Sequence, residues 1–91
     1  MKHFVISYDI SDDAKRGKVS SLLEDHGQRV QYSVFECRLD EKALDKLTGK
    51  LQPFAEGSDS IRIYQICEAC LKKVVLLGNA TVSEERRFFV V

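Results

Sequence analysis

The sequence lacks the long apolar run that a transmembrane helix requires, because an apolar stretch such as Val74–Leu77 is far too short to cross a bilayer. The N-terminal residues also lack the pattern of a secretory signal. We therefore expect a cytoplasmic protein with no membrane partner. Only one proline and five glycines occur in 91 residues, which gives no sign of a linker or a disordered segment. Residues 1–91 are predicted to form one small domain.

The sequence also has no excess of either charge, because 14 basic residues balance 14 acidic residues. A free-standing nucleic-acid-binding protein usually carries a strong positive charge, so a polyanion-binding site on this protein must be local.

Cysteine is scarce, and the three that occur are Cys37, Cys67 and Cys70. In a cytoplasmic protein this odd number predicts buried, reduced thiols rather than disulfides. Cys67 and Cys70 have the spacing of half a zinc site, but the chain offers no second pair. A redox role would require a helix N-terminus that lowers a thiol pKa, and the sequence does not predict that setting.

The spacing of apolar residues predicts the secondary structure. Strands are predicted at residues 3–9, 28–37, 60–67 and 72–77, and helices at residues 14–26 and 40–54. Residues 11–13 and Asp40 are candidate N-caps of the two helices. Although the order of elements is then β-α-β-α-β-β, we expect an α+β fold: a ferredoxin-like split βαβ sandwich, with a four-stranded antiparallel sheet and two helices on one face.

The first predicted strand runs into Tyr8 and Asp9 at its exit. A buried strand rarely accepts an ionised carboxylate without a partner, whereas the end of a strand can hold one that faces a cleft. Asp9 is therefore the best candidate for chemistry. The alternative is that Asp9 only turns the chain toward the following helix.

Basic residues follow this strand closely. Lys15, Arg16 and Lys18 bring cations to the first predicted helix, and Arg29 and Arg38 flank the second predicted strand. Such a group could contact phosphates, although scattered surface cations usually serve only solvation.

Three segments together resemble a known family: Tyr8-Asp9-Ile10, residues 15–19 (KRGKV) and residues 28–37 (QRVQYSVFEC). They resemble the small CRISPR-associated adaptation protein, family two, formerly described as an endoribonuclease, and the similarity covers nearly the whole chain. The resemblance implies a ferredoxin-like homodimer in which residues 84–91 add a C-terminal strand to the sheet of the partner subunit. An apolar segment such as Phe88–Val91 would favour aggregation if it were left uncovered, which agrees with that role.

The resemblance also implies a function in CRISPR spacer acquisition. The homodimer would bind duplex DNA, bridge the CRISPR integrase, and cleave single-stranded RNA or double-stranded DNA with the help of a metal ion. Asp9 residues of two subunits would meet and hold Mg²⁺ or Mn²⁺, which prefer oxygen ligands. A non-catalytic ferredoxin-like interaction or regulatory domain is the alternative, and it predicts no affinity for nucleic acid.

The family pattern further implies the residues around the cleft. Tyr8 and Asp9 would be catalytic, and the nucleic acid would contact Arg16, Lys18, Arg29 and Phe35. Lys15 and Arg38 are added to the predicted nucleic-acid contacts because of their charge. Lys18 stands where the family often has arginine, which keeps the charge but weakens a bidentate phosphate contact. The strand alternation favours a core position for Phe35, so a stacking role rests on the resemblance alone.

Overall fold

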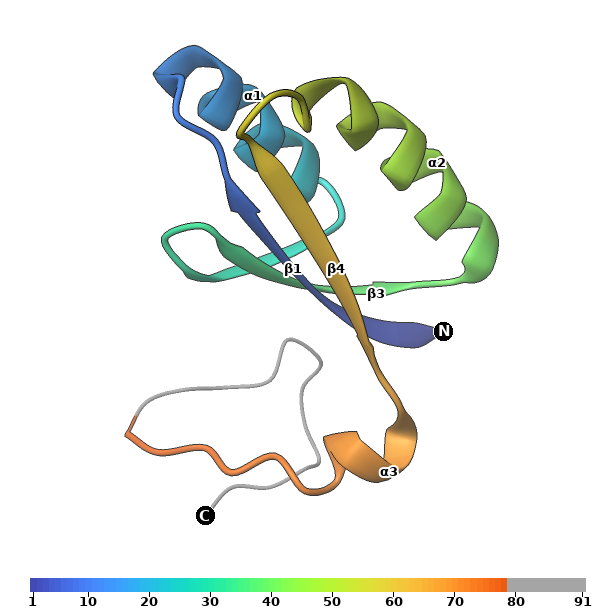
Figure 1. Cartoon of the computed structure of the whole chain (residues 1–91). Coiled ribbons are helices and arrows are strands. Elements are labelled where there is room, and N and C mark those ends of the chain that lie inside the picture. Colours follow the sequence, from blue (N-terminus) through green and yellow to red (C-terminus); the bar gives the residue numbers. More distant parts are fainter. Residues whose placement is uncertain (79–91) are drawn as a thin grey trace.

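The computed structural model describes residues 1–78 of the chain (Figure 1). Its elements are, in chain order, β1 (Lys2–Asp9), α1 (Asp13–Glu24), β2 (Gly27–Gln31), β3 (Val34–Leu39), α2 (Glu41–Leu51), the 3-10 turn η1 (Gln52–Phe54), β4 (Ser60–Ile66) and α3 (Glu68–Leu71). The predicted exchange strand at residues 84–91 lies outside the described residues. None of the helices within residues 1–78 is long and apolar enough to cross a membrane.

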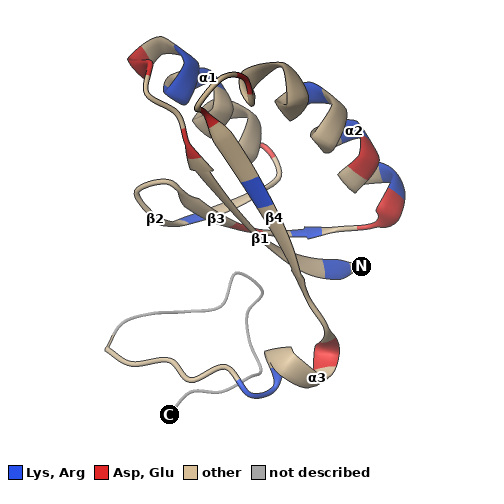
Figure 2. Cartoon of the chain, viewed as in Figure 1, with Lys and Arg blue, Asp and Glu red and all other residues tan. Residues whose placement is uncertain are grey.

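The four strands form one antiparallel sheet in the order β2-β3-β1-β4. Helices α1 and α2 lie together on one face of this sheet, whereas α3 lies beyond the end of β4 and away from them (Figure 1). The β-α-β-β-α-β order confirms the predicted ferredoxin-like α+β fold. Acidic and basic residues are mixed on both α1 and α2, in keeping with the neutral composition (Figure 2).

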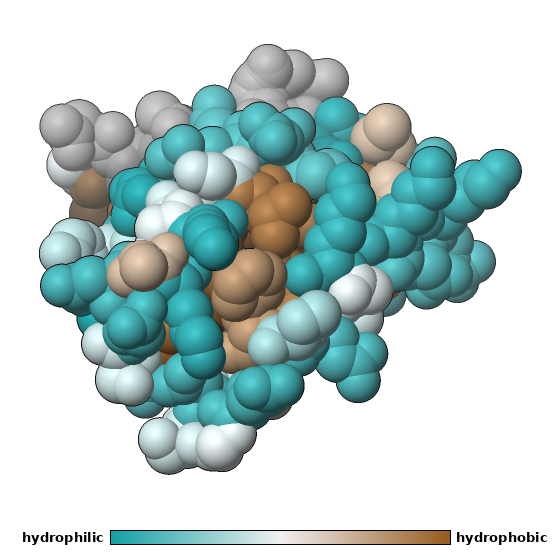
Figure 3. Space-filling view, turned by 90° about the horizontal axis from the view of Figure 1, so that it is seen from above, coloured by the Kyte–Doolittle hydropathy of each residue, from teal (hydrophilic) through white to brown (hydrophobic). Residues whose placement is uncertain are grey.

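The core lies between the sheet and the two helices. Alternate residues of β1 and β3 point into it, and α1 and α2 contribute one apolar side each. The buried apolar residues are Phe4, Ile6, Tyr8, Ile10, Val19, Leu23, Phe35, Cys37, Leu39, Leu47 and Leu51. Seen from the helix side, apolar surface emerges among hydrophilic residues (Figure 3). Some apolar surface is therefore left exposed on this side of the molecule.

Side-chain caps fix where the two long helices begin. The Asp12 carboxylate accepts a hydrogen bond of 2.9 Å from the Lys15 backbone N–H, and the Asp40 carboxylate accepts one of 2.8 Å from the Ala43 N–H. Each cap satisfies a donor that the first helical turn leaves unpaired. Both lie at the positions that the sequence predicts.

Residues 28–37 form a hairpin rather than the single strand that the alternation predicts. Tyr32 and Ser33 make a two-residue turn between β2 and β3. Gly27 starts β2 so close to β3 that a Cβ atom there would lie 2.1 Å from the Glu36 carbonyl oxygen. Only glycine fits this approach without movement of the backbone.

The predicted strand at residues 72–77 is also wrong. After β4, Cys67 caps the one-turn helix α3, and residues 74–77 have no regular secondary structure. Apolar β-prone residues form a strand only where a neighbouring strand pairs with them, and no described strand lies beside this segment. The apolar pattern alone could not supply that partner.

Candidate functional site

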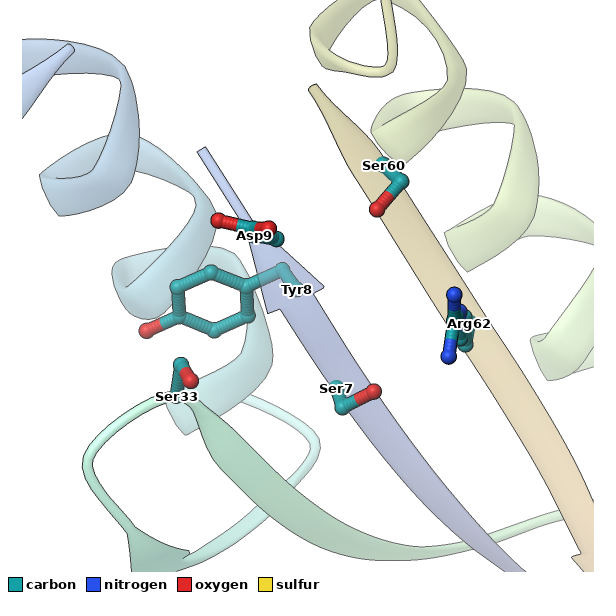
Figure 4. A pocket seen from close by; sticks show the side chains of 6 residues that line it. All are labelled: Ser7, Tyr8, Asp9, Ser33, Ser60 and Arg62. Atoms are coloured by element: carbon teal, nitrogen blue, oxygen red, sulfur yellow. The ribbon is translucent and has the colours of Figure 1, made fainter. Parts of the chain in front are cut away.

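A pocket of about 320 Å³ lies where β1 ends. Three segments border it: β1 with Ser7, Tyr8 and Asp9, β4 with Ser60 and Arg62, and the β2–β3 turn with Ser33 (Figure 4). The pocket therefore combines one carboxylate, one guanidinium and several hydroxyl groups at one edge of the sheet.

Strand register explains why these side chains meet. Asp9 pairs with Ser60 and Ser7 pairs with Arg62 across β1 and β4, so all four side chains lie on the sheet face that α1 and α2 do not cover. Asp9 and Arg62 are both exposed. Neither side chain makes a hydrogen bond or an ion pair with another residue of the described range 1–78. Their charged groups are thus available to a ligand.

Tyr8 points the other way and lies at the border between this pocket and a second one. Its side chain is 7% exposed, and its ring centroid is 6.4 Å from that of Phe35. Its backbone N–H donates a hydrogen bond of 3.1 Å to the Ser33 carbonyl, which holds the β2–β3 turn against the end of β1. Tyr8 and Ser33 line both pockets.

The second pocket, of about 340 Å³, lies between α1 and the β2–β3 turn. It contains Arg16 and Arg29, and both guanidinium groups already have partners. Arg16 donates to the carbonyls of Ile10 (3.0 Å) and Ser11 (3.2 Å) and pairs with the Asp13 carboxylate. These bonds fasten the β1–α1 connection to the first turn of α1.

Arg29 is held in the same way. Its guanidinium donates to the Tyr32 carbonyl and the Ser20 hydroxyl, lies 3.5 Å from a Glu24 carboxylate oxygen, and covers the Phe35 ring at 5.0 Å. A phosphate that bound Arg16 or Arg29 would have to compete with the carbonyl, hydroxyl and carboxylate groups that these guanidinium groups already contact.

Three of the basic residues predicted to bind nucleic acid lie outside both pockets. Lys15 and Lys18 are exposed on α1. Arg38 pairs with His3 near the start of β1, six residues from Asp9, which places Arg38 roughly 20 Å from the carboxylate. The lysines share the Asp9 end of the molecule, whereas Arg38 belongs to the opposite end of the sheet.

Phe35 lies in the core with no exposed surface. A base could stack on this ring only if Arg29 and the surrounding core moved away, so the stacking role suggested for Phe35 disagrees with its burial. The alternation of the strand, which favours a core position, gives the correct placement.

Comparison with known proteins agrees with this geometry. The family model of the CRISPR associated protein Cas2 matches residues 1–74. This chain belongs to the Cas2 family. The resemblance stated from the sequence is thereby confirmed.

Two Cas2 relatives and one solved structure show how far the likeness extends. The CRISPR-associated endoribonuclease Cas2 1 of Chloroflexus aurantiacus is 42% identical over 83 residues, which cover 89% of either chain. The CRISPR-associated endonuclease Cas2 2 of Thermus thermophilus is 39% identical over 84 residues, covering 91% of this chain and 89% of that protein. A chain in a solved partial Cas6-RT-Cas1–Cas2 complex is 34% identical with a TM-score of 0.72, covering 81% of this chain and 88% of its own length.

The donors in the Asp9 pocket of this Cas2-family chain suit a hard cation. Carboxylate, hydroxyl and carbonyl oxygens are the ligands that Mg²⁺ and Mn²⁺ prefer, and no described residue competes for the Asp9 oxygens. One subunit supplies a single carboxylate, and within residues 1–78 no cluster of three acidic, histidine or cysteine residues exists. Within the described residues, Asp9 would therefore be the one carboxylate of this pocket that could hold such a cation, with its remaining ligands supplied from elsewhere.

Sequence reasoning missed Arg62 together with Ser7, Ser33 and Ser60. The alternation of residues 60–67 does place Ser60 and Arg62 on the same face of their strand. An arginine between two isoleucines of a predicted strand was the available signal. Strand order and register, which decide that this face meets Asp9, could not be derived from it.

The three thiols of this Cas2-family chain differ in environment. Cys37 is fully buried, whereas Cys67 and Cys70 are exposed, so the prediction that all three are buried is wrong for the last two. Burial, with a smaller contribution from the Glu36 carboxylate, raises the pKa of the Cys37 thiol to about 11.

Proposed function

We propose that this chain acts in CRISPR spacer acquisition as a homodimer that binds duplex DNA together with the integrase, and that its paired Asp9 residues support metal-dependent cleavage of phosphodiester bonds. The main support is the Asp9 carboxylate, which is exposed, lines a polar pocket and has no partner among the described residues. A capping residue would be engaged with the backbone, as Asp12 is. The alternative that Asp9 merely turns the chain is therefore less well supported.

A homodimer is supported by apolar surface on and after β4. Tyr64 on the uncovered sheet face is 53% exposed, and Val75 and Leu77 are more exposed still. β4 is an edge strand of the sheet, so its outer side offers a place for a further strand. In a twofold dimer the same surface meets its own copy, which can bring two Asp9 carboxylates to one seam.

The solved relative provides the support for an integrase partner, because a Cas2-like chain occurs there in a Cas1–Cas2 complex. We propose a corresponding partner for this chain.

Nucleic acid would meet cations at the same end of the molecule. Arg62 inside the pocket and Lys15 and Lys18 on α1 are exposed, whereas Arg16 and Arg29 are held by the fold. Each phosphate that a lysine or arginine neutralises releases counterions, so binding should weaken as salt is added. Duplex DNA is the proposed substrate, and single-stranded RNA is proposed as a second one.

In the proposed reaction the residues of the chain have separate tasks. Asp9 from each subunit would hold Mg²⁺ or Mn²⁺, which supplies a Lewis acid that polarises a phosphodiester. Arg62 orients the phosphate and compensates the charge that develops on its oxygens. Tyr8 closes the inner side of the pocket and fixes the turn that carries Ser33.

Replacing Asp9 by asparagine tests the proposed enzyme. Asp9→Asn keeps the shape of the side chain but removes the charge that holds the metal, so Mg²⁺-dependent cleavage of DNA or RNA should fall at least about 100-fold. Asp45→Asn is the matched control, because Asp45 is an exposed aspartate on α2 outside both pockets. The variants are compared by cleavage rate, duplex binding and sedimentation.

The outcomes separate the hypotheses. Cleavage that is lost in Asp9→Asn and kept in Asp45→Asn, with dimer and DNA binding unchanged, supports the enzyme. Cleavage that persists in Asp9→Asn contradicts a catalytic role for Asp9. DNA binding without cleavage in every variant indicates a scaffold, and the absence of salt-sensitive binding would favour the non-catalytic interaction domain.

A further inference from the structure

Cys67 and Cys70 lie next to each other on the surface, directly after β4. Cys67 is the N-cap of α3 and has extended backbone angles, and its sulfur accepts a hydrogen bond of 3.4 Å from the Cys70 backbone N–H. The Leu71 N–H donates to the Cys67 carbonyl at 2.9 Å, which closes the turn around the pair. The Cys67 sulfur is thus held over the residue that carries the second thiol.

We propose that Cys67 and Cys70 form a reversible dithiol–disulfide modification site, oxidised by low-molecular-weight disulfides such as oxidised glutathione. This inference is independent of the proposed nuclease activity. The Cys-x-x-Cys spacing within one turn keeps the two residues close enough for an intramolecular bond without rearrangement of the sheet.

The two thiols differ in a way that suits this reaction. The hydrogen bond from the Cys70 backbone lowers the pKa of the Cys67 thiol, and the hydrogen bond between the two side chains raises the pKa of the Cys70 thiol. Since the thiolate is the attacking form, Cys67 reacts first. The fold thereby assigns one nucleophile and one resolving cysteine.

The proposed thiol–disulfide exchange takes place in two steps. The Cys67 thiolate attacks one sulfur of the glutathione disulfide, forms a mixed disulfide and releases one glutathione. Cys70 then gives up its proton, its sulfur attacks the Cys67 sulfur, and the second glutathione leaves and takes up a proton. The protein loses two electrons and two protons, and the oxidant gains them as two thiols.

A closed metal site explains the pair less well. Structural zinc is held by four protein ligands, and within residues 1–78 no third cysteine, histidine or carboxylate joins Cys67 and Cys70 in a cluster. The third cysteine, Cys37, is buried on β3 and cannot reach them without unfolding of the core.

The location gives the modification a structural consequence. α3 connects the edge strand β4 with the apolar segment Val74–Leu77, in which Val75 and Leu77 are exposed (Figure 1). A disulfide across this single turn would fix the direction in which the chain leaves the sheet. The reduced pair leaves the turn held by hydrogen bonds alone, without a covalent link between its two ends.

The test exposes the reduced full-length protein to oxidised glutathione and measures intact mass and non-reducing peptide maps. The wild type should lose two hydrogen atoms, retain no glutathione and contain a Cys67–Cys70 bond that dithiothreitol reverses. Cys70→Ser should instead stop with one glutathione on Cys67. Cys67→Ser should react at least about tenfold more slowly than Cys70→Ser, because it lacks the activated thiolate.

Cys37 serves as the internal control and should stay unmodified in the folded protein throughout. Stable glutathione adducts on both cysteines of the wild type, or a disulfide between two chains as the main product, would overturn the proposal. So would loss of two hydrogen atoms from Cys70→Ser, because that bond could only involve Cys37 or a second chain.

Discussion

Two pairs of charged residues on opposite sides of the sheet are held in opposite ways. On the side of α1, Arg16 and Arg29 are surrounded by carbonyl, hydroxyl and carboxylate groups, and Arg29 also covers the buried Phe35 ring. On the other side, the side chains of Asp9 and Arg62 share a polar pocket but bond to no residue within the described range. Arg16 and Arg29 therefore stabilise the fold, whereas the side chains of Asp9 and Arg62 have no partner among the described residues and can contact a ligand.

This difference separates stability from function. Removing a side chain whose neighbours depend on it leaves unsatisfied groups or a cavity, and the free energy of unfolding falls. Removing an exposed charge without a partner changes folding little, but it takes away a contact that a ligand would use. The helix side should therefore respond in stability measurements, and the open side in binding and cleavage.

The largest expected effect is on the helix side, at Phe35. Phe35→Ala removes a fully buried ring that contacts Tyr8 and lies under Arg29, so the free energy of unfolding should fall by about 3–5 kcal/mol. Tyr32→Ala is the control, because this ring is 84% exposed and should change stability by no more than about 0.5 kcal/mol. Denaturant unfolding at a fixed protein concentration measures both. Similar losses in the two variants would contradict the burial of Phe35.

A smaller effect should distinguish the two arginines. Arg29→Ala should lower the free energy of unfolding by about 1–2 kcal/mol, because the Tyr32 carbonyl and Ser20 hydroxyl lose their donor. Arg62→Ala should leave stability within about 0.5 kcal/mol, weaken duplex DNA binding and reduce its salt slope by about 1. Lys46→Ala, an exposed cation on α2, controls for net charge. If Arg62→Ala and Lys46→Ala bind DNA equally well, Arg62 is not a phosphate contact.

The sequence predicts much of the helix side because that side follows local rules. Asp12 and Asp40 cap helices by contacts three residues along the chain, and the apolar spacing marks the faces that enter the core. The hairpin in residues 27–39 escaped detection for a particular reason. A bulge between Arg29 and Gln31 shifts the strand pairing by one residue, so that beyond it, away from the turn, odd-numbered residues of β2 lie opposite odd-numbered residues of β3. The alternation of side chains therefore continues through the turn as it would in a single strand.

The candidate site could be predicted only in part. Asp9 at the exit of a strand is a local signal, and so is the basic start of α1. Arg62 joins Asp9 through the register of β1 against β4, which connects residues more than fifty positions apart in the chain. Likewise, no local feature of the sequence shows that the Arg29 guanidinium contacts Ser20 and Glu24. The charge of Arg29 alone suggests a phosphate contact.

The smallest expected effect concerns pH and the buried Cys37. Burial raises the pKa of its thiol to about 11 in the folded protein, whereas the same thiol has a pKa of about 8.5 in the unfolded chain. Above the pKa of the thiol in the unfolded chain, the unfolded state binds fewer protons than the folded state. The contribution of this thiol to stability is therefore complete below that pKa and is lost as the pH rises toward 11. Urea unfolding of Cys37→Ala should show a flatter decline over this range than the wild type. Equal slopes in Cys37→Ala and the wild type would mean that Cys37 ionises as freely in the folded chain as in the unfolded one, and that the helix-covered face admits water.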